Sequence, residues 1–124
     1  MSGDRVVSED RLCDWLGDLA GFGADAAYLV GLGRESYVAD TPQGRLLRNA
    51  GERLLIKVAT IVERLPEDFK SRYPDVDWAS INRMRNLVAH QYDKVNDDLM
   101  FVTLRRDIPT LIQRLGPAPQ DPEA

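Results

Sequence analysis

Residues 41–65 read TPQGRLLRNAGERLLIKVATIVERL, and this stretch decides the fold. Thr41 before Pro42 is typical of a helix start, with threonine as the cap and proline at the first helical position. The stretch ends directly before Pro66, which would interrupt a helix. Ile56 falls on the polar side and indicates either an exposed apolar side chain or a subunit contact. The residues expected on the apolar stripe of this helix are Leu46, Leu47, Ala50, Leu54, Val58, Ile61 and Leu65.

The N-terminal part of the chain shows the same helical spacing. Ser8 followed by Glu9 and Asp10 is typical of a capped helix start with acidic residues in the first turn. Apolar residues then recur on one arc as far as Val30, before a Gly-Leu-Gly stop at residues 31–33. Three glycines inside this segment weaken the prediction of an unbroken helix, namely Gly17, Gly21 and Gly23.

Two further helices are expected towards the C-terminus. One is expected over residues 77–90. The other is expected over residues 97–115, where Pro109 should kink or loosen it. No alternating segment long enough for a strand occurs in the sequence. We therefore expect an all-α fold, an up-down bundle of about four main helices.

Length and composition fit one soluble domain. The 124 residues are 44% apolar and 29% charged, which excludes a disordered or fibrous chain. We expect residues 1–115 to form the domain and the Pro-rich residues 116–124 to form a disordered tail. No stretch approaches the roughly 18 apolar residues that span a bilayer, and the N-terminus has no apolar signal-peptide core. One cysteine excludes a disulfide framework and a multi-cysteine zinc site, so we expect a cytoplasmic location.

The charge and the histidine count restrict the chemistry. Sixteen Lys and Arg against twenty Asp and Glu give a net charge of −4. The chain therefore lacks the overall basic charge of a non-specific nucleic-acid binder, and contact with RNA or DNA would need a local basic patch. His90 is the single histidine, so chemistry that needs two histidines from one chain is excluded.

Residues 78–95, WASINRMRNLVAHQYDKV, carry the most information about function. On a helical wheel Arg85 lies at the edge of the apolar arc, so its cation needs a carboxylate partner or lines a cleft that takes an anion. His90 lies about 140° from Arg85 on an ideal helix. The two can converge only if the helix ends near His90 or if a second copy of the chain completes the site. The poor helix formers after His90 favour such an end.

Each of these residues also has a purely structural interpretation. Arg85 could extend its side chain along the core edge or form a salt bridge. His90 could cap the carbonyls at a helix C-terminus, where its charge would favour the helix dipole. Tyr92 could be a core or interface aromatic. Periodicity and composition alone therefore predict a small soluble helical domain.

The string RNLVAHQY, from Arg85 to Tyr92, resembles the Arg-x-x-x-x-His-x-Tyr motif of the HepT-like toxins, in the HEPN superfamily of ribonucleases. The preceding RLPEDFKSRYPDVDWASINRMRN and the later DIPTL also resemble that family, and the resemblance covers about residues 45–115. Asn96 and Phe101 stand where the family often has Asp and Trp.

The resemblance implies a HEPN-like helical domain that dimerises, with two motifs facing each other across the interface. The implied activity is metal-independent endonucleolytic RNA cleavage by the toxin of a toxin–antitoxin pair. The implied partner is a small MntA-like nucleotidyltransferase antitoxin, which neutralises the toxin by transferring AMP from ATP onto Tyr92. The resemblance implies no cofactor and no metal for the toxin itself, and no membrane contact.

The residue chemistry agrees with those roles. His90 would move the 2′-hydroxyl proton, because an imidazole titrates near neutral pH. Arg85 would bind the phosphate and the charge that develops on it, and Asn86 would orient by hydrogen bonding. The products would carry a 2′,3′-cyclic phosphate and a 5′-hydroxyl. The basic residues that could hold RNA, or could simply form a solvated face, are Arg83, Lys94, Arg105 and Arg106.

A second function class remains open. The chain could be a non-catalytic helical dimer that acts as a binding scaffold for a nucleotidyltransferase. The acidic net charge and the single histidine favour this alternative.

Overall fold

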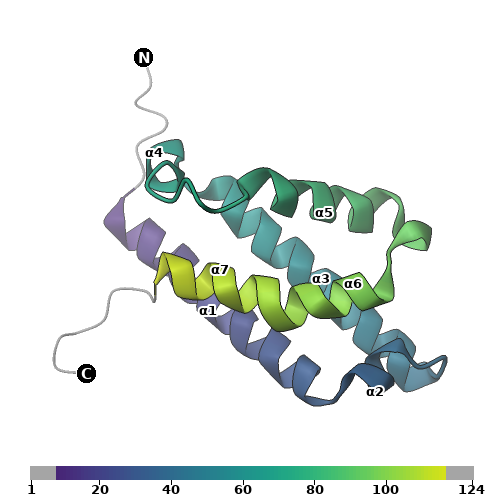
Figure 1. The fold of residues 1–124 in the computed structure, drawn as a ribbon. Helices are drawn as coiled ribbons and strands as arrows, with labels where there is room; N and C mark the ends of the chain where they lie inside the picture. The colour runs from purple at the N-terminus through teal and green to yellow at the C-terminus, as the bar shows by residue number, and fades with distance from the viewer. Residues whose placement is uncertain (1–7, 117–124) are drawn as a thin grey trace, which may run out of the picture.

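The computed structural model describes residues 8–116, apart from the side chain of Tyr92, as helices and their connections (Figure 1). These described residues contain no strand, and the predicted all-α fold is confirmed. The tail predicted over residues 116–124 lies outside the described residues from position 117 onward. The four main helical segments are α1 (Glu9–Gly31), α3 (Pro42–Arg64), α5 (Trp78–His90) and a last row made of α6 (Asp97–Val102), η3 (Thr103–Asp107) and α7 (Ile108–Leu115). The short connecting helices are α2 (Arg34–Val38), α4 (Glu67–Lys70) and η2 (Tyr92–Lys94).

Helix α1 starts where the sequence predicts. The side chain of Ser8 accepts a hydrogen bond from the backbone N–H of Arg11 at 3.1 Å. The helix continues through its three internal glycines, which the sequence had left open. Burial of one face against the rest of the bundle outweighs the low helix propensity of glycine. Gly23 has a packing reason, because a Cβ there would lie 2.6 Å from Cδ1 of Ile112 in α7.

Helix α3 is the central element and packs against α1, α2, α5 and α6. Thr41 caps it by accepting a hydrogen bond from the N–H of Gly44 at 3.0 Å, as predicted. The C-terminal half of the predicted apolar stripe is buried, but Leu46 and Ala50 are exposed. Ile56 is half-buried against the core, so its placement on the polar side is wrong.

The start of α3 buries a different face because α2 lies against it. Gly44 and Gly51 are buried there, and a Cβ at Gly44 would lie 2.1 Å from the carbonyl oxygen of Ala39. A Cβ at Gly51 would lie 2.9 Å from the hydroxyl of Tyr37. Tyr37 is fully buried and stacks at a tilt on Phe101, with ring centroids 5.5 Å apart. Gly51 therefore makes room for the aromatic ring that joins α2 to α3 and α6, and Gly44 makes room for the backbone at the end of α2.

The last helical row is loosened before Pro109, as predicted. Proline has no N–H to donate to the carbonyl one turn earlier, and the row widens into a π-helical turn over Thr103–Asp107. Pro109 then stands in the first turn of α7, where its missing N–H costs little.

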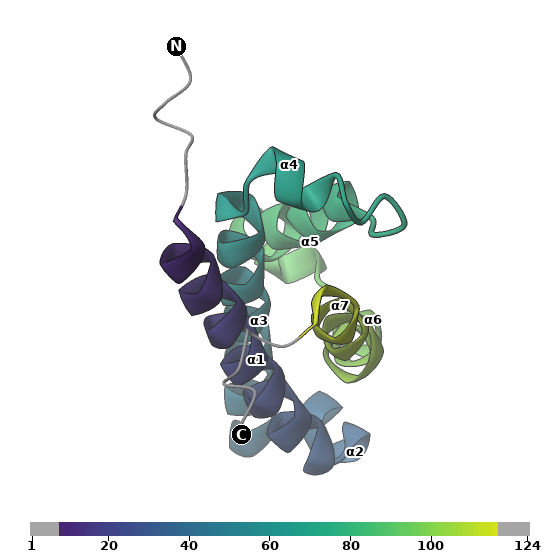
Figure 2. The ribbon, with the colours of Figure 1, turned by 90° about the vertical axis from the view of Figure 1, so that its left-hand side faces the viewer.

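Helix α5 stands apart from the last row, and both lie against α3 or its neighbours (Figure 2). A groove of about 470 Å³ runs between them and is lined by residues that include Ile81 of α5 and Arg106 and Leu111 of the last row. Ile81, which lines this groove, is only half-buried. Among the described residues, no helix has the length and apolar character needed to cross a membrane.

Candidate functional site

The candidate site is built on α5, whose two ends have clear local causes. Asp77 caps its start by accepting a hydrogen bond from the N–H of Ser80 at 3.0 Å. Its last residue is His90, because Gln91 leaves the helical conformation and donates its N–H back to the carbonyl of Leu87 at 2.9 Å. The prediction that the helix ends near His90 is therefore confirmed.

The segment before α5 is held by a bidentate ion pair to the last helical row. Arg114 of α7 donates from Nε and Nη2 to the carboxylate of Asp75, at 2.8 and 3.1 Å. The guanidinium also lies 4.8 Å from the ring centroid of Tyr73. The hydrogen bond from Arg114 holds the pKa of the Asp75 carboxyl below its usual value. This pair fixes the loop that leads into the helix of the site.

Arg85 lies at the packing edge between α5 and α3. Its side chain is 29% exposed, but its Nε is buried and has no hydrogen-bond partner among the described residues. Its Nη2 donates to Oδ1 of Asn82 at 3.3 Å and lies 3.7 Å from Oε1 of Glu63, the penultimate residue of α3. The sequence predicted a carboxylate partner or an anion site for Arg85, and Glu63 is that carboxylate.

The other motif residues are exposed. Asn86 and His90 are both exposed on α5, and no hydrogen bond joins either side chain to Arg85 within the described part of the chain. Tyr92 begins the short turn η2, directly after the end of α5, but its side chain lies outside the described residues. The motif therefore lies on one continuous segment, from α5 into η2. Within the described residues, no hydrogen bond brings the side chains of Arg85 and His90 together.

The four basic residues considered for RNA contact come from three elements, α5, η2 and η3. Arg83 lies 3.7 Å from the carboxylate of Asp77, and Arg106 pairs with its neighbour Asp107 at 3.1 Å. Lys94 in η2 and Arg105 in η3 are exposed. Arg106 lines the groove beside α5, whereas Arg83 and Lys94 belong to the segment of the motif. Two of the four charges are therefore partly neutralised by neighbouring carboxylates.

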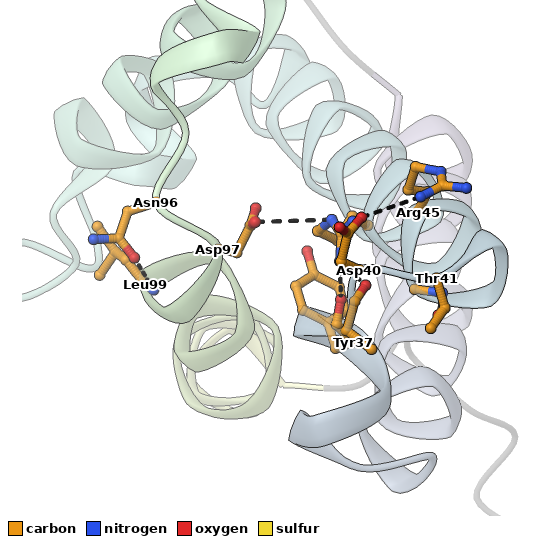
Figure 3. A network of polar contacts seen from close by, with 10 residues as sticks. Tyr37, Asp40, Thr41, Arg45, Asn96, Asp97 and Leu99 are labelled. Carbon is orange, nitrogen blue, oxygen red and sulfur yellow. Dashed lines mark hydrogen bonds and ion pairs between the residues drawn. The ribbon is translucent and has the colours of Figure 1, made fainter.

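A second polar cluster, which we call the polar junction, holds the end of the motif segment in place. It consists of Tyr37, Arg48, Glu52 and Asp97, where α2, α3 and α6 meet. Figure 3 labels Tyr37 and Asp97 of this cluster. Arg48 donates from Nη1 to the carbonyls of Tyr37 and Ala39, both at 2.8 Å, and its Nε lies 3.7 Å from Asp97. Because Asp97 opens α6, this cluster ties the segment that follows the motif back onto α3.

Burial shapes the chemistry of the polar junction. The hydroxyl of Tyr37 is buried without a hydrogen-bond partner among the described residues, and burial raises its pKa far above the usual value. Burial also raises the pKa of Glu52, and the nearby charge of Asp97 adds to this effect while Arg48 opposes it. Arg34 of α2 makes a further ion pair with Asp98, the second residue of α6.

Sequence reasoning missed three residues of these clusters. Asn82 could have been found, because it stands three residues before Arg85 on the same helix face. Glu63 comes from another helix, and no local spacing connects it to the motif. Arg48 lies off the predicted apolar stripe, where a charged side chain is expected to face solvent. Within the described residues no group of three or more His, Cys, Asp or Glu side chains could hold a metal ion.

Comparisons with known proteins point to one family. A family model described as Ribonuclease HepT-like matches residues 27–116. A protein of Thermococcus cleftensis named "Probable ribonuclease HepT" is 32% identical over 59 residues, which are 48% of this chain and 54% of that protein. A protein of Caldanaerobacter subterraneus subsp. tengcongensis named as a candidate RNase is 31% identical over 81 residues, which are 65% of this chain and 69% of that one. The chain thus spans between about half and two thirds of these curated relatives. No solved structure matches it significantly.

Proposed function

Because this chain belongs to the HepT-like ribonuclease family, we propose that it is a metal-independent endoribonuclease whose site is the motif on α5. The observation that carries the proposal is the position of Arg85. Its guanidinium lies at the edge of the α3–α5 packing, and the same helix ends at His90, two residues before Tyr92. A fixed cation and an exposed imidazole on one segment are the groups that cleavage of RNA requires.

The proposed reaction is an internal transfer at phosphorus. His90 takes the proton of a ribose 2′-hydroxyl, and the 2′-oxygen attacks the adjacent phosphorus atom. The bond from phosphorus to the 5′-oxygen breaks, and that oxygen leaves with a proton. The products are a 2′,3′-cyclic phosphate and a 5′-hydroxyl. Arg85 binds the phosphate and stabilises the charge that develops on its oxygens, and Asn86 orients it by hydrogen bonding.

The proposed assembly is a dimer with a composite site. One imidazole cannot act as base and acid at the same instant, and the chain has one histidine. A second copy would supply the second imidazole. His90 and Asn86 are exposed, which is compatible with a site completed by another chain.

The proposed biological role is that of the toxin in a toxin–antitoxin pair. A nucleotidyltransferase antitoxin would join the Tyr92 hydroxyl to the α-phosphate of ATP and release pyrophosphate. The added AMP would bring a negative phosphate and a bulky nucleoside next to Arg85 and His90. It would therefore compete with RNA for the cation. Incubation with the antitoxin and ATP should add the mass of AMP to the protein but not to Tyr92→Phe.

The test is cleavage of a mixed tRNA and mRNA substrate in EDTA. Intact-mass analysis first selects protein with unmodified Tyr92. We expect the wild type to cleave and to leave cyclic-phosphate ends. We expect Arg85→Ala and His90→Ala to lose at least about 100-fold in rate, the usual size of such contributions. Arg45→Ala is the matched control, because Arg45 is exposed at the start of α3 and pairs with Asp40 (Figure 3).

The same experiment separates the alternative function. If unmodified wild-type protein leaves RNA intact, the ribonuclease proposal is wrong for this chain. The binding-scaffold function would then be favoured. Its support in the structure is the pairing of Arg83, Arg85 and Arg106 with carboxylates, which weakens the local basic patch that RNA binding needs.

A further inference from the structure

We propose that Glu63 is a built-in competitor for RNA phosphate at Arg85, so that the carboxylate limits how tightly the site binds its substrate. This inference rests on the proposed function of Arg85. It concerns a residue of α3 that lies outside the motif and contacts it only through the fold. Glu63 touches no reacting atom in this proposal and acts through Arg85 alone.

The first argument is the way Arg85 is held. Its Nε is buried, so a ligand cannot reach that edge of the guanidinium. The side chain is nevertheless 29% exposed, so the accessible part lies elsewhere on it. Its Nη2 is the atom that contacts Asn82 and Glu63. A phosphate that binds this cation therefore approaches the terminal nitrogens Nη1 and Nη2, and Glu63 already faces Nη2.

The second argument is the looseness of the ion pair. The Nη2 to Oε1 separation of 3.7 Å is longer than a hydrogen bond, and the Glu63 side chain is 66% exposed. An exposed pair at this distance contributes little to stability and exchanges readily with solvent. Glu63 can therefore move aside when a phosphate, which carries a full charge and several acceptor oxygens, approaches Arg85.

The third argument is the position of Glu63 in its helix. It lies in the last turn of α3, where the free carbonyl groups already give the helix end a partial negative charge. A carboxylate is disfavoured there, and both negative groups act at the same end of the helix. The neighbourhood of Arg85 is therefore less attractive to RNA than the cation alone would be, and removal of the Glu63 charge should strengthen binding.

The test compares Glu63→Gln with a matched control. Glu35→Gln removes the same charge from an exposed position in α2, far from α5 in both views (Figures 1 and 2). The probe is a fluorescent single-stranded RNA of mixed sequence with 2′-O-methyl groups, which cannot be cleaved. Binding is followed by anisotropy at low and high salt. Cleavage of the matching unmethylated RNA gives kcat and KM for each variant.

We expect Glu63→Gln to bind the RNA about 2- to 5-fold more tightly at low salt, the range that exposed ion pairs contribute. KM should fall by a similar factor while kcat changes little. The gain should shrink at high salt because exposed charges are screened. In an Arg85→Ala background the gain should drop to that of Glu35→Gln, which measures the effect of overall charge alone.

Several results would overturn the inference. Equal gains from Glu63→Gln and Glu35→Gln would show a general charge effect. Weaker binding or a lower kcat in Glu63→Gln would show that the carboxylate positions Arg85 rather than competes for it. In both cases the wild type still cleaves RNA, and the proposed function stands. If the wild type neither binds nor cleaves RNA, the proposed function fails and the competition fails with it.

Discussion

Arg48 and Arg85 both project from helices of the α3–α5 region, but the structure treats the two cations differently. Arg48 is 17% exposed and donates two hydrogen bonds of 2.8 Å to backbone carbonyls, with Asp97 beside its Nε. Arg85 has a buried Nε without a partner, one contact of 3.3 Å and one ion pair of 3.7 Å. The hydrogen-bond donors of Arg48 are thus largely used within the fold, whereas the guanidinium of Arg85 can still bind a ligand.

The comparison separates a structural cation from one available to a ligand. A buried cation with short hydrogen bonds is costly to remove, because the carbonyls and the carboxylate lose their partners. A half-exposed cation in a loose pair contributes little to stability, and its charge can act on a substrate instead. The polar junction thus fixes α6 and the end of the motif segment, and the motif itself stays chemically open.

The largest expected effect is on stability at Arg48. We expect Arg48→Met to lower the free energy of unfolding by about 2–4 kcal/mol, because two backbone carbonyls and Asp97 lose a half-buried donor. Arg85→Met should change it by no more than about 1 kcal/mol. Urea denaturation of both variants measures the difference. Similar losses in both variants would erase the distinction between the two arginines.

The next effect concerns the close packing of Gly51 against Tyr37. We expect Gly51→Ala to lower the free energy of unfolding by about 1–3 kcal/mol, because its Cβ would lie 2.7 Å from Leu104 and 2.9 Å from the Tyr37 hydroxyl. Gly17→Ala is the control, since nothing lies within 4 Å of a Cβ there, and it should stabilise α1 by up to about 1 kcal/mol. Thermal unfolding compares them. A stabilised Gly51→Ala would mean that the polar junction is loosely packed.

A smaller effect is expected at the hydroxyl of Tyr37. This buried group has no hydrogen-bond partner among the described residues, so its removal deletes no interaction. We expect Tyr37→Phe to change the free energy of unfolding by less than about 1 kcal/mol, with a gain more expected than a loss. Urea denaturation measures it. A loss above that size would indicate that the hydroxyl contributes to the junction after all.

The smallest effect is a pH dependence at Glu52. Its pKa is raised in the folded state by burial, so the folded chain holds this proton more tightly than the unfolded chain. The stability of the wild type relative to Glu52→Gln should therefore be greatest at acidic pH, below the ordinary glutamate pKa. It should fall as the pH rises through the raised pKa and then level off. Urea midpoints of both proteins from about pH 4 to 7 test this. A difference that rises with pH would contradict the burial of Glu52.

Much of the fold could be predicted because helix caps, prolines and poor helix formers act on their neighbours in the sequence. Ser8 and Thr41 are short polar caps whose hydrogen bonds need only the next turn of the same helix. Pro109 loosens its helix through a missing N–H, an effect confined to one turn. The end of α5 at His90 follows from the poor helix formers behind it. Each of these features involves neighbours in the sequence, which is why the pattern of residues predicts them.

The face that α3 buries at its start was not predictable in this way. Periodicity pointed to Leu46 and Ala50, but both are exposed, and Gly44 and Gly51 are buried instead. Glycine carries no apolar side chain, so a search for apolar spacing passes over it. The burial arises because α2 folds back onto α3. The backbone of Ser36 and Ala39 lies against Gly44, and the Tyr37 ring lies against Gly51.

The sequence by itself determined the four main helical segments, the caps at Ser8 and Thr41, and the motif from Arg85 to Tyr92, since these depend on short spacings along the chain. The tertiary structure alone decided which carboxylate faces Arg85 and which arginine is saturated. Glu63 stands 22 positions before Arg85 (85 − 63), and Asp97 stands 49 positions after Arg48 (97 − 48). Such partners meet only when separate helices pack, because ion pairs form through space and leave no periodic trace in the sequence.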